Sequence, residues 1–187
     1  MPVEIEIKLR IDHLAPIRDR LRELGAKRIG EVIETNIFFD TADRALLSSD
    51  CGLRLRHSRD VQTHADRLVL SFKGPRAEGP VKQREEIEIV VDDQEATIEL
   101  MSRLGYEVRL MFEKRRESWQ IEQCKVELDS LPELGSFLEI ESRTQAEVLK
   151  IQEKLGLSKV EGVLQTYPDL VAHHLSDRGA RETTLKF

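Results

Sequence analysis

Alternation of apolar and charged residues is the dominant pattern of this chain. From Val3 to Ile11 every second residue is aliphatic and every residue between is charged, the period of a strand with one apolar face. The same argument predicts further strands at residues 27–40 (as one strand or two), 52–59, 68–74, 85–93, 108–121, 125–129 and 137–141. A polar loop over about 60–66 and a Gly/Pro-bearing loop over 74–82 connect neighbouring strands.

Apolar residues spaced three and four apart predict helices between the strands. One helix follows the first strand and ends at Gly25. A second is expected to begin at a capping box of Asp92 and Glu95, and a third at Thr144 and Glu147. Their expected apolar faces are Leu14, Ile17, Leu21 and Leu24; Leu100, Met101 and Leu104; and Val148, Ile151 and Leu155. A short helix is predicted from Pro168 to about Leu175.

The tripeptide Glu-Ile-Glu occurs three times, at 4–6, 86–88 and 139–141, and each copy precedes a helix that closes on Leu-Gly. A strand–helix unit therefore repeats along the chain. We predict an α+β fold, a closed eight-stranded antiparallel β-barrel with helices packed outside. Residues 1–175 are expected to form a single domain, followed by a C-terminal tail at 176–187.

Composition excludes several classes of protein. A net charge of −6 argues against nucleic-acid binding, which needs a basic surface. No apolar run is long enough to span a membrane, and no signal segment opens the chain. Only Cys51 and Cys124 are present, without metal-type spacing. We therefore expect a cytoplasmic protein with no membrane or nucleic-acid partner; a homodimer is left open.

The charged strand faces are of two kinds, which a merely solvated surface does not require. One kind is acidic: Glu4 and Glu6, Glu86 and Glu88, Glu127 and Asp129, Glu139 and Glu141. The other is basic: Arg54 and Arg56, Lys114 and Arg116, with Lys8, Lys73 and Arg84 placed singly. A wet outer surface remains the alternative. Positively and negatively charged side chains recur at two-residue spacing on most strands. This pattern favours a barrel with a polar lumen, whose apolar faces are turned to outer helices.

A lumen with both signs suits polyphosphate chemistry. Guanidinium groups bind phosphate oxygens bidentately and lysines act as point charges. Paired carboxylates hold Mg²⁺ or Mn²⁺, which bridge to phosphates. The chain has no Walker loop or Gly-rich nucleotide fingerprint, so side chains would have to hold the phosphates.

The N-terminal Glu4-x-Glu6-x-Lys8 resembles the ExExK signature of the CYTH superfamily, the triphosphate tunnel metalloenzymes. The resemblance continues through NIFFDTADRALLSSDCGLRLR, LSFKGP, REEIEI, EKRRESW and VELDSLPELGSFLEIE. It covers roughly residues 3 to 170 in family order, and it is greatest with the class IV adenylate cyclase branch.

The resemblance implies an eight-stranded tunnel that binds a triphosphate with Mg²⁺ or Mn²⁺. The metal-binding positions it implies are Glu4, Glu6, Asp129, Glu139 and Glu141. The phosphate-binding positions are Lys8, Arg54, Arg56, Lys73, Arg84, Lys114 and Arg116. Catalytic roles fall on Lys8, Arg56 and Lys114, and Glu86, Glu88 and Glu127 are additional acidic positions.

Three functions are compatible with these residues. In a cyclase, the 3′-hydroxyl of ATP attacks the α-phosphorus and releases pyrophosphate. In a triphosphatase, water attacks the terminal phosphorus of tripolyphosphate, a nucleoside triphosphate or thiamine triphosphate. A binding module without turnover is the third, and the large carboxylate set argues against it. Some cyclases of the family carry a His-Phe pair ahead of ExExK, which this chain lacks, so the first two functions stay open.

Overall fold

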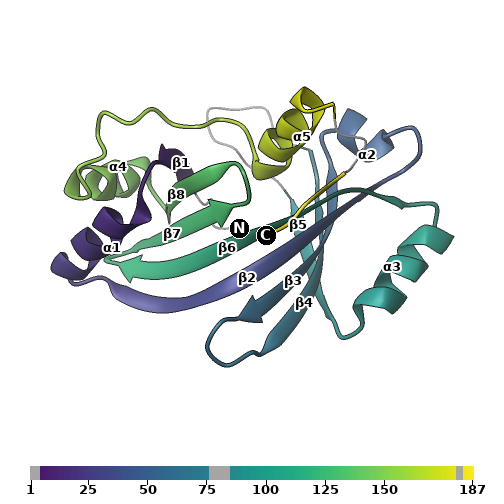
Figure 1. The fold of residues 1–187 in the computed structure, drawn as a ribbon, viewed down its shortest axis with the longest axis horizontal. Helices are drawn as coiled ribbons and strands as arrows, with labels where there is room; N and C mark the ends of the chain where they lie inside the picture. The colour runs from purple at the N-terminus through teal and green to yellow at the C-terminus, as the bar shows by residue number, and fades with distance from the viewer. Residues whose placement is uncertain (1–4, 76–84, 180–182) are drawn as a thin grey trace. The chain divides into compact units, whose positions relative to one another are not determined.

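A computed structural model describes residues 5–75, 85–179 and 183–187. The chain divides into two compact units. Unit 1 comprises Met1–Val32 and Lys114–Thr166, and unit 2 comprises Ile33–Glu113 and Tyr167–Phe187. Figure 1 follows the chain through its elements, and two long strands, β2 and β6, run from one unit into the other.

The described part of unit 1 contains an antiparallel run of strands in the order β1-β8-β7-β6, and the first part of β2 belongs to the same unit. Its elements are β1 (Ile5–Ile11), α1 (Leu14–Glu23), the first part of β2 (Lys27–Asp40), the second part of β6 (Glu107–Ile121), β7 (Cys124–Leu131), β8 (Gly135–Ser142) and α4 (Gln145–Lys154). The predicted strands and helices of this unit are confirmed, and residues 27–40 form a single strand.

Unit 2 continues the order as β6-β2-β3-β4-β5. Its further elements are α2 (Ala45–Ser48), β3 (Gly52–Asp60), β4 (Asp66–Lys73), β5 (Glu86–Val91), α3 (Gln94–Arg103), α5 (Tyr167–Asp177) and β9 (Thr184–Leu185). The expected tail therefore contains the end of α5 and the strand β9, which pairs in parallel with β6 at Met111 and Phe112.

The core of unit 1 lies between the apolar face of the sheet and two helices. Leu9, Val126 and Ile140 from three strands are buried against Leu21 of α1 and Ile151 of α4. Figure 1 shows both helices beside β1, β7 and β8. The alternation read from the sequence thus does place the apolar residues of these strands under helices.

The core of unit 2 forms in the same way on a smaller scale. Ile37, Phe39 and Leu55 are buried with Met101 of α3. The expected apolar face of α3 is only partly right, because Leu100 and Leu104 are more than half exposed. The predicted capping residue is also displaced: the side chain of Asp93, one position later, accepts the Ala96 N–H. At α4 the predicted cap is confirmed, since Thr144 accepts the N–H of Glu147.

In the part of the chain that the structure describes, the fold is α+β, and nine strands form a mostly antiparallel sheet. Over the described residues the hydrogen-bonded path ends at β1 and at β5 and does not close, so the closed barrel stays a prediction. None of the helices described is long and apolar enough to cross a membrane.

Candidate functional site

The register of unit 1 places its charged residues on one face of four adjacent strands. Lys8 of β1 lies opposite Glu139 of β8, Glu139 opposite Glu127 of β7, and Asp129 of β7 opposite Arg116 of β6. Because side chains alternate along a strand, these residues share a face, and the core residues occupy the other. The predicted separation of the two faces is confirmed here.

This charged face is buried, and its groups are held in pairs. Asp129 is 0% exposed, and Lys8, Lys114 and Glu139 are also buried. Charged groups are rarely buried unless a partner compensates for lost hydration. A buried network of this kind adds little to stability relative to apolar packing, so it suggests a functional role.

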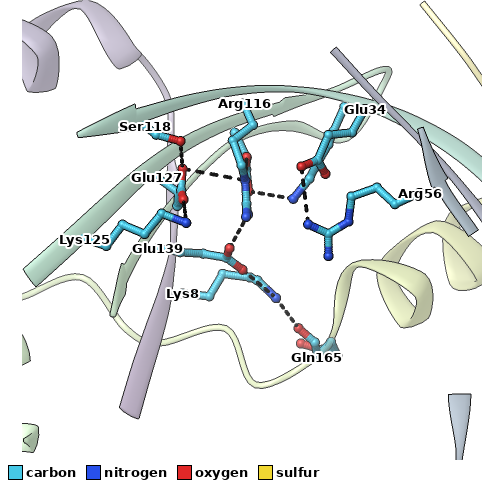
Figure 2. A network of polar contacts seen from close by, with 11 residues as sticks. Lys8, Glu34, Arg56, Arg116, Ser118, Lys125, Glu127, Glu139 and Gln165 are labelled. Atoms are coloured by element: carbon cyan, nitrogen blue, oxygen red, sulfur yellow. Dashed lines mark hydrogen bonds and ion pairs between the residues drawn. The ribbon is translucent and has the colours of Figure 1, made fainter. Parts of the chain in front are cut away.

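Arg116 is the centre of the network (Figure 2). Its Nε donates to Asp129 Oδ1 at 2.7 Å, and its Nη2 donates to both Asp129 and Glu139. Lys114 Nζ lies 3.4 Å from Asp129 Oδ2. Two carboxylates from neighbouring strands therefore converge on one guanidinium, and four of the predicted site residues are brought together.

Lys8 joins the network from the first strand. Its Nζ lies 3.4 Å from Glu139 Oε1 and donates to the Gln165 carbonyl at 3.1 Å. The segment that carries Gln165 is anchored on β1, because Val163 N–H donates to the Lys8 carbonyl. Lys8 is thus held by hydrogen bonds at its backbone carbonyl and at its side-chain ammonium group.

Glu127 and the pair Glu6 and Glu141 extend the acidic side of this face. Glu127 accepts a hydrogen bond from Ser118 at 2.6 Å and is paired with Lys125. Glu6 lies directly opposite Glu141 in the β1–β8 register. Lys125 of β7 lies opposite Glu141 on its other side, which offsets the unfavourable placement of like charges on neighbouring strands.

Unit 2 has a polar face of its own. Arg54 and Arg56 of β3 lie opposite Ser71 and Val69 of β4, and Ser71 lies opposite Glu88 of β5. Lys73 lies opposite Glu86 and pairs with it at 3.2 Å. Arg56 Nη1 lies 3.7 Å from Glu34 of β2, a buried carboxylate that the sequence analysis did not single out.

The guanidinium of Arg54 is incompletely satisfied. Its Nε and Nη2 are buried and have no hydrogen-bond partner among the described residues. Burial, together with the charge of Arg56, lowers the pKa of Arg54 to about 10, so the group remains a cation at neutral pH. Buried donors without acceptors are rare in native proteins, and on a basic residue they indicate a place for an anion.

The opposite face of β6 carries a different cluster that the sequence analysis missed. Glu117 accepts from Arg18 at 2.6 Å, from Arg28 at 3.0 Å and from the Trp119 indole at 3.1 Å. Burial acts to raise the pKa of Glu117, but the hydrogen bonds from the two arginines outweigh it, so the pKa is lowered. Since these partners lie on α1, β2 and the core side of β6, the cluster fastens the helix layer to the sheet.

Two further residues are structural. Trp119 and Cys124 are buried in the unit 1 core, and burial raises the pKa of the Cys124 thiol. Arg115 faces away from Arg116 and pairs with Glu31 at the surface. Glu4 and Arg84 lie outside the described residues.

The acidic residues of this face could bind a divalent cation such as Mg²⁺ only if phosphate oxygens or water completed its coordination shell. Over the part of the chain that the structure describes, no three His, Cys, Asp or Glu side chains are placed to hold a metal ion alone. Asp129 and Glu139, however, converge on the same Arg116 guanidinium. Mg²⁺ commonly takes only one or two carboxylates and completes its shell with water and phosphate oxygens, a pattern that this pair matches.

Comparison with known proteins identifies the family. The model of the CYTH domain matches residues 2–167 of the chain. This protein belongs to the CYTH family. The resemblance seen in the sequence is therefore confirmed, and the CYTH match spans both units described above.

Similar proteins support the same fold. The chain is 28% identical to a predicted adenylate cyclase from Methanocaldococcus jannaschii over 177 residues, covering 90% of this CYTH protein and 98% of the relative. A Pyrococcus horikoshii structure matches with a TM-score of 0.75 and 27% identity, over 91% and 99% of the two chains. A Hippeastrum protein, described as a predicted adenylyl cyclase with dominant triphosphatase activity, matches with a TM-score of 0.67 at 21% identity, over 96% and 98%.

Proposed function

We propose that this protein is a metal-dependent enzyme that binds ATP through its triphosphate and converts it to cyclic AMP and pyrophosphate. The observation that carries the proposal is the buried network in which Arg116, Lys8 and Lys114 are held by Asp129 and Glu139. Membership of the CYTH family and the similarity to a predicted adenylate cyclase support the same reading.

In this proposal the basic side chains bind the phosphates. Arg54 and Arg56 offer guanidinium donors, of which three nitrogens are buried and without acceptors among the described residues. Phosphate oxygens accept such donors at bidentate geometry. Lys8, Lys114 and Arg116 supply further positive charge, and Lys73 and Arg84 complete the proposed set. The closed eight-stranded tunnel implied by the family resemblance is part of this proposal.

The acidic side chains would hold the metal. Asp129 and Glu139 are the proposed ligands in the described unit 1 network, with Glu6, Glu141 and Glu4 as the remaining members of the set. A bound Mg²⁺ or Mn²⁺ would neutralise charge on the phosphate oxygens. Glu127, Glu86 and Glu88 are assigned to orient the basic residues, because Glu127 Oε2 lies 3.9 Å from Arg116 Nε and Glu86 pairs with Lys73.

The chemistry proposed is an in-line displacement at the α-phosphorus. The 3′-hydroxyl releases its proton to water, and the O3′–Pα bond forms as the bond from Pα to the bridging oxygen of the leaving pyrophosphate breaks. Lys8, Arg56 and Lys114 are proposed to stabilise the charge that develops on the phosphate oxygens, the type of electrostatic stabilisation that contributes most in such sites.

Triphosphate hydrolysis is the second candidate function. The Hippeastrum protein, of similar fold, is described as having a dominant triphosphatase activity. The same basic and acidic sets would serve a reaction in which water attacks the terminal phosphorus. The two functions differ in which phosphorus reacts and in the attacking group.

Product analysis separates these possibilities. Purified protein is incubated with ATP, and in parallel with tripolyphosphate, in Mg²⁺ and in Mn²⁺, and cAMP, ADP, pyrophosphate and orthophosphate are then separated. cAMP with an equal amount of pyrophosphate supports the cyclase. Orthophosphate without cAMP supports the triphosphatase and refutes the cyclase, and binding without any product refutes both.

A further inference from the structure

Asn36 is a buried polar residue for which neither the sequence analysis nor the family resemblance assigns a role. It lies on β2 within unit 2 and is 2% exposed. Its side-chain nitrogen Nδ2 is buried and has no hydrogen-bond partner among the described residues. A buried donor without an acceptor costs about 1–3 kcal/mol, so its retention in a strand needs a physical reason.

The position of Asn36 relates this donor to the basic residues. Asn36 and Glu34 are two residues apart on β2 and therefore share a face of the sheet. Glu34 pairs with Arg56 of the neighbouring β3, so this face of β2 adjoins the face that carries Arg54 and Arg56. Asn36 thus belongs to the polar face of unit 2, while Ile37 and Phe39 belong to its core.

Among the described residues of β2 and β3, most of the buried groups without a hydrogen-bond partner are donors. They are Asn36 Nδ2, Nε and Nη2 of Arg54 and Nε of Arg56, and one acceptor, Glu34 Oε2, accompanies them although Glu34 also pairs with Arg56. Four donors exceed what this one carboxylate oxygen can satisfy, so further acceptor oxygens are needed. Three side chains on two neighbouring strands with the same deficiency point to one ligand with several oxygens rather than to isolated water molecules.

We propose that Asn36 is a further substrate-binding residue that donates from Nδ2 to an oxygen of the phosphate chain held by Arg54 and Arg56. This inference rests on the proposed function and extends its binding set. An amide donor adds directionality without adding charge. Since the neighbouring donors are guanidinium groups suited to phosphate, the contact is assigned to the phosphate chain and not to the nucleoside.

The test uses two ligands that share only the phosphate chain, bis(methylene) triphosphonate, which has no hydrolysable bridge, and α,β-methylene-ATP, whose methylene bridge blocks cyclisation. The β–γ bond of α,β-methylene-ATP remains cleavable, so released orthophosphate is assayed in the same samples. The Kd values of both ligands are measured by isothermal titration calorimetry in Mg²⁺ for the wild type, Asn36→Leu and Asn36→Ala. Thr35→Val is the matched control, since Thr35 is the adjacent β2 residue on the opposite face. Ligand-free Tm is measured for each protein.

We expect both Asn36 variants to raise the Kd of both ligands by the same factor, about 10- to 100-fold. This is the effect of losing one hydrogen bond to a charged group. Thr35→Val should bind as the wild type does. The ligand-free Tm of Asn36→Leu should stay equal or rise, because an unsatisfied polar group is replaced by an apolar one.

Three results would overturn the inference while leaving the proposed function intact. The first is unchanged affinity of the Asn36 variants for both ligands. The second is a loss for α,β-methylene-ATP alone, which would place Asn36 at the nucleoside. The third is a lower ligand-free Tm in both variants, which would reveal a structural partner. A wild type that binds neither ligand instead refutes the proposed function itself.

Discussion

Replacement of Glu139 by Gln is the sharpest test of the buried network in unit 1. The substitution keeps the size of the side chain and one carbonyl oxygen but removes the negative charge. Glu139 accepts from Arg116 and lies 3.4 Å from Lys8. Arg116 keeps its contacts with Asp129, and Lys8 keeps the Gln165 carbonyl, so neither cation is left without a partner.

The remaining contacts set the size of the effect on stability. Removal of one member of a buried ion pair costs about 3–5 kcal/mol when the other is stranded. Because both cations retain an acceptor, we expect a smaller loss of about 1–3 kcal/mol, the range of a hydrogen bond to a charged group. For a chain of this length that corresponds to a fall in Tm of about 2–12 °C, and the variant should remain folded at 25 °C.

The effect on turnover should be much larger than the effect on stability. A metal ion that stabilises the transition-state charge contributes several kcal/mol, so loss of a ligand is expected to lower metal-dependent kcat by about 100-fold or more. Turnover is measured against Mn²⁺ concentration, with Tm measured on the same samples. Glu153→Gln, the same chemical change at an exposed position on α4, is the control. A Glu139→Gln enzyme with wild-type kcat and an unchanged Mn²⁺ requirement would refute the metal assignment.

Three further predictions test individual contacts. Arg56→Ala should weaken triphosphate binding by about tenfold or more, the loss of a charge-assisted hydrogen bond, whereas Arg115→Ala should change it little; equal Kd values for the two variants would contradict the assignment of faces. The lowered pKa of Glu117 means that its contribution to folding is present above its unfolded pKa of about 4.5 and is lost as pH falls through the lower folded value. The difference in unfolding free energy between wild type and Glu117→Gln should therefore shrink between pH 7 and pH 3, and a constant difference would argue against the ion cluster. Asp93→Ala should cost about 1 kcal/mol as an N-cap, a Tm loss of about 2–4 °C, whereas Asp92→Ala should leave Tm unchanged; thermal melts of both variants check this.

Much of the local structure could be predicted because strand periodicity depends only on neighbouring residues. The alternation in β1 and β8 correctly separated Lys8 and Glu139 from the apolar residues between them. Thr144 was correctly predicted as a cap because capping involves contacts within one turn. At α3 the predicted cap, Asp92, was wrong: the adjacent Asp93 caps the helix, and backbone geometry rather than composition decides between two neighbouring aspartates.

The exposed leucines of α3 show where periodicity fails. Leu100, Met101 and Leu104 share a face by helical spacing, yet only Met101 is buried. Spacing identifies a face of a helix, but the width of the sheet beneath it determines how much of that face is covered. The sequence therefore could not distinguish the leucines that remain exposed from the methionine that packs.

By itself, the sequence determined eight strands, their two faces, four helices and the residues of each charge, because these follow from local spacing; it did not predict the short elements α2 and β9. The tertiary structure decided which charges meet. Arg116 reaches both Asp129 and Glu139 because the registers of β6, β7 and β8 bring them together. Burial of Asn36 and pairing of Glu34 with Arg56 likewise depend on residues distant in the chain. Contacts between strands are set by pairing and packing of the whole sheet, and this information is not contained in any local pattern.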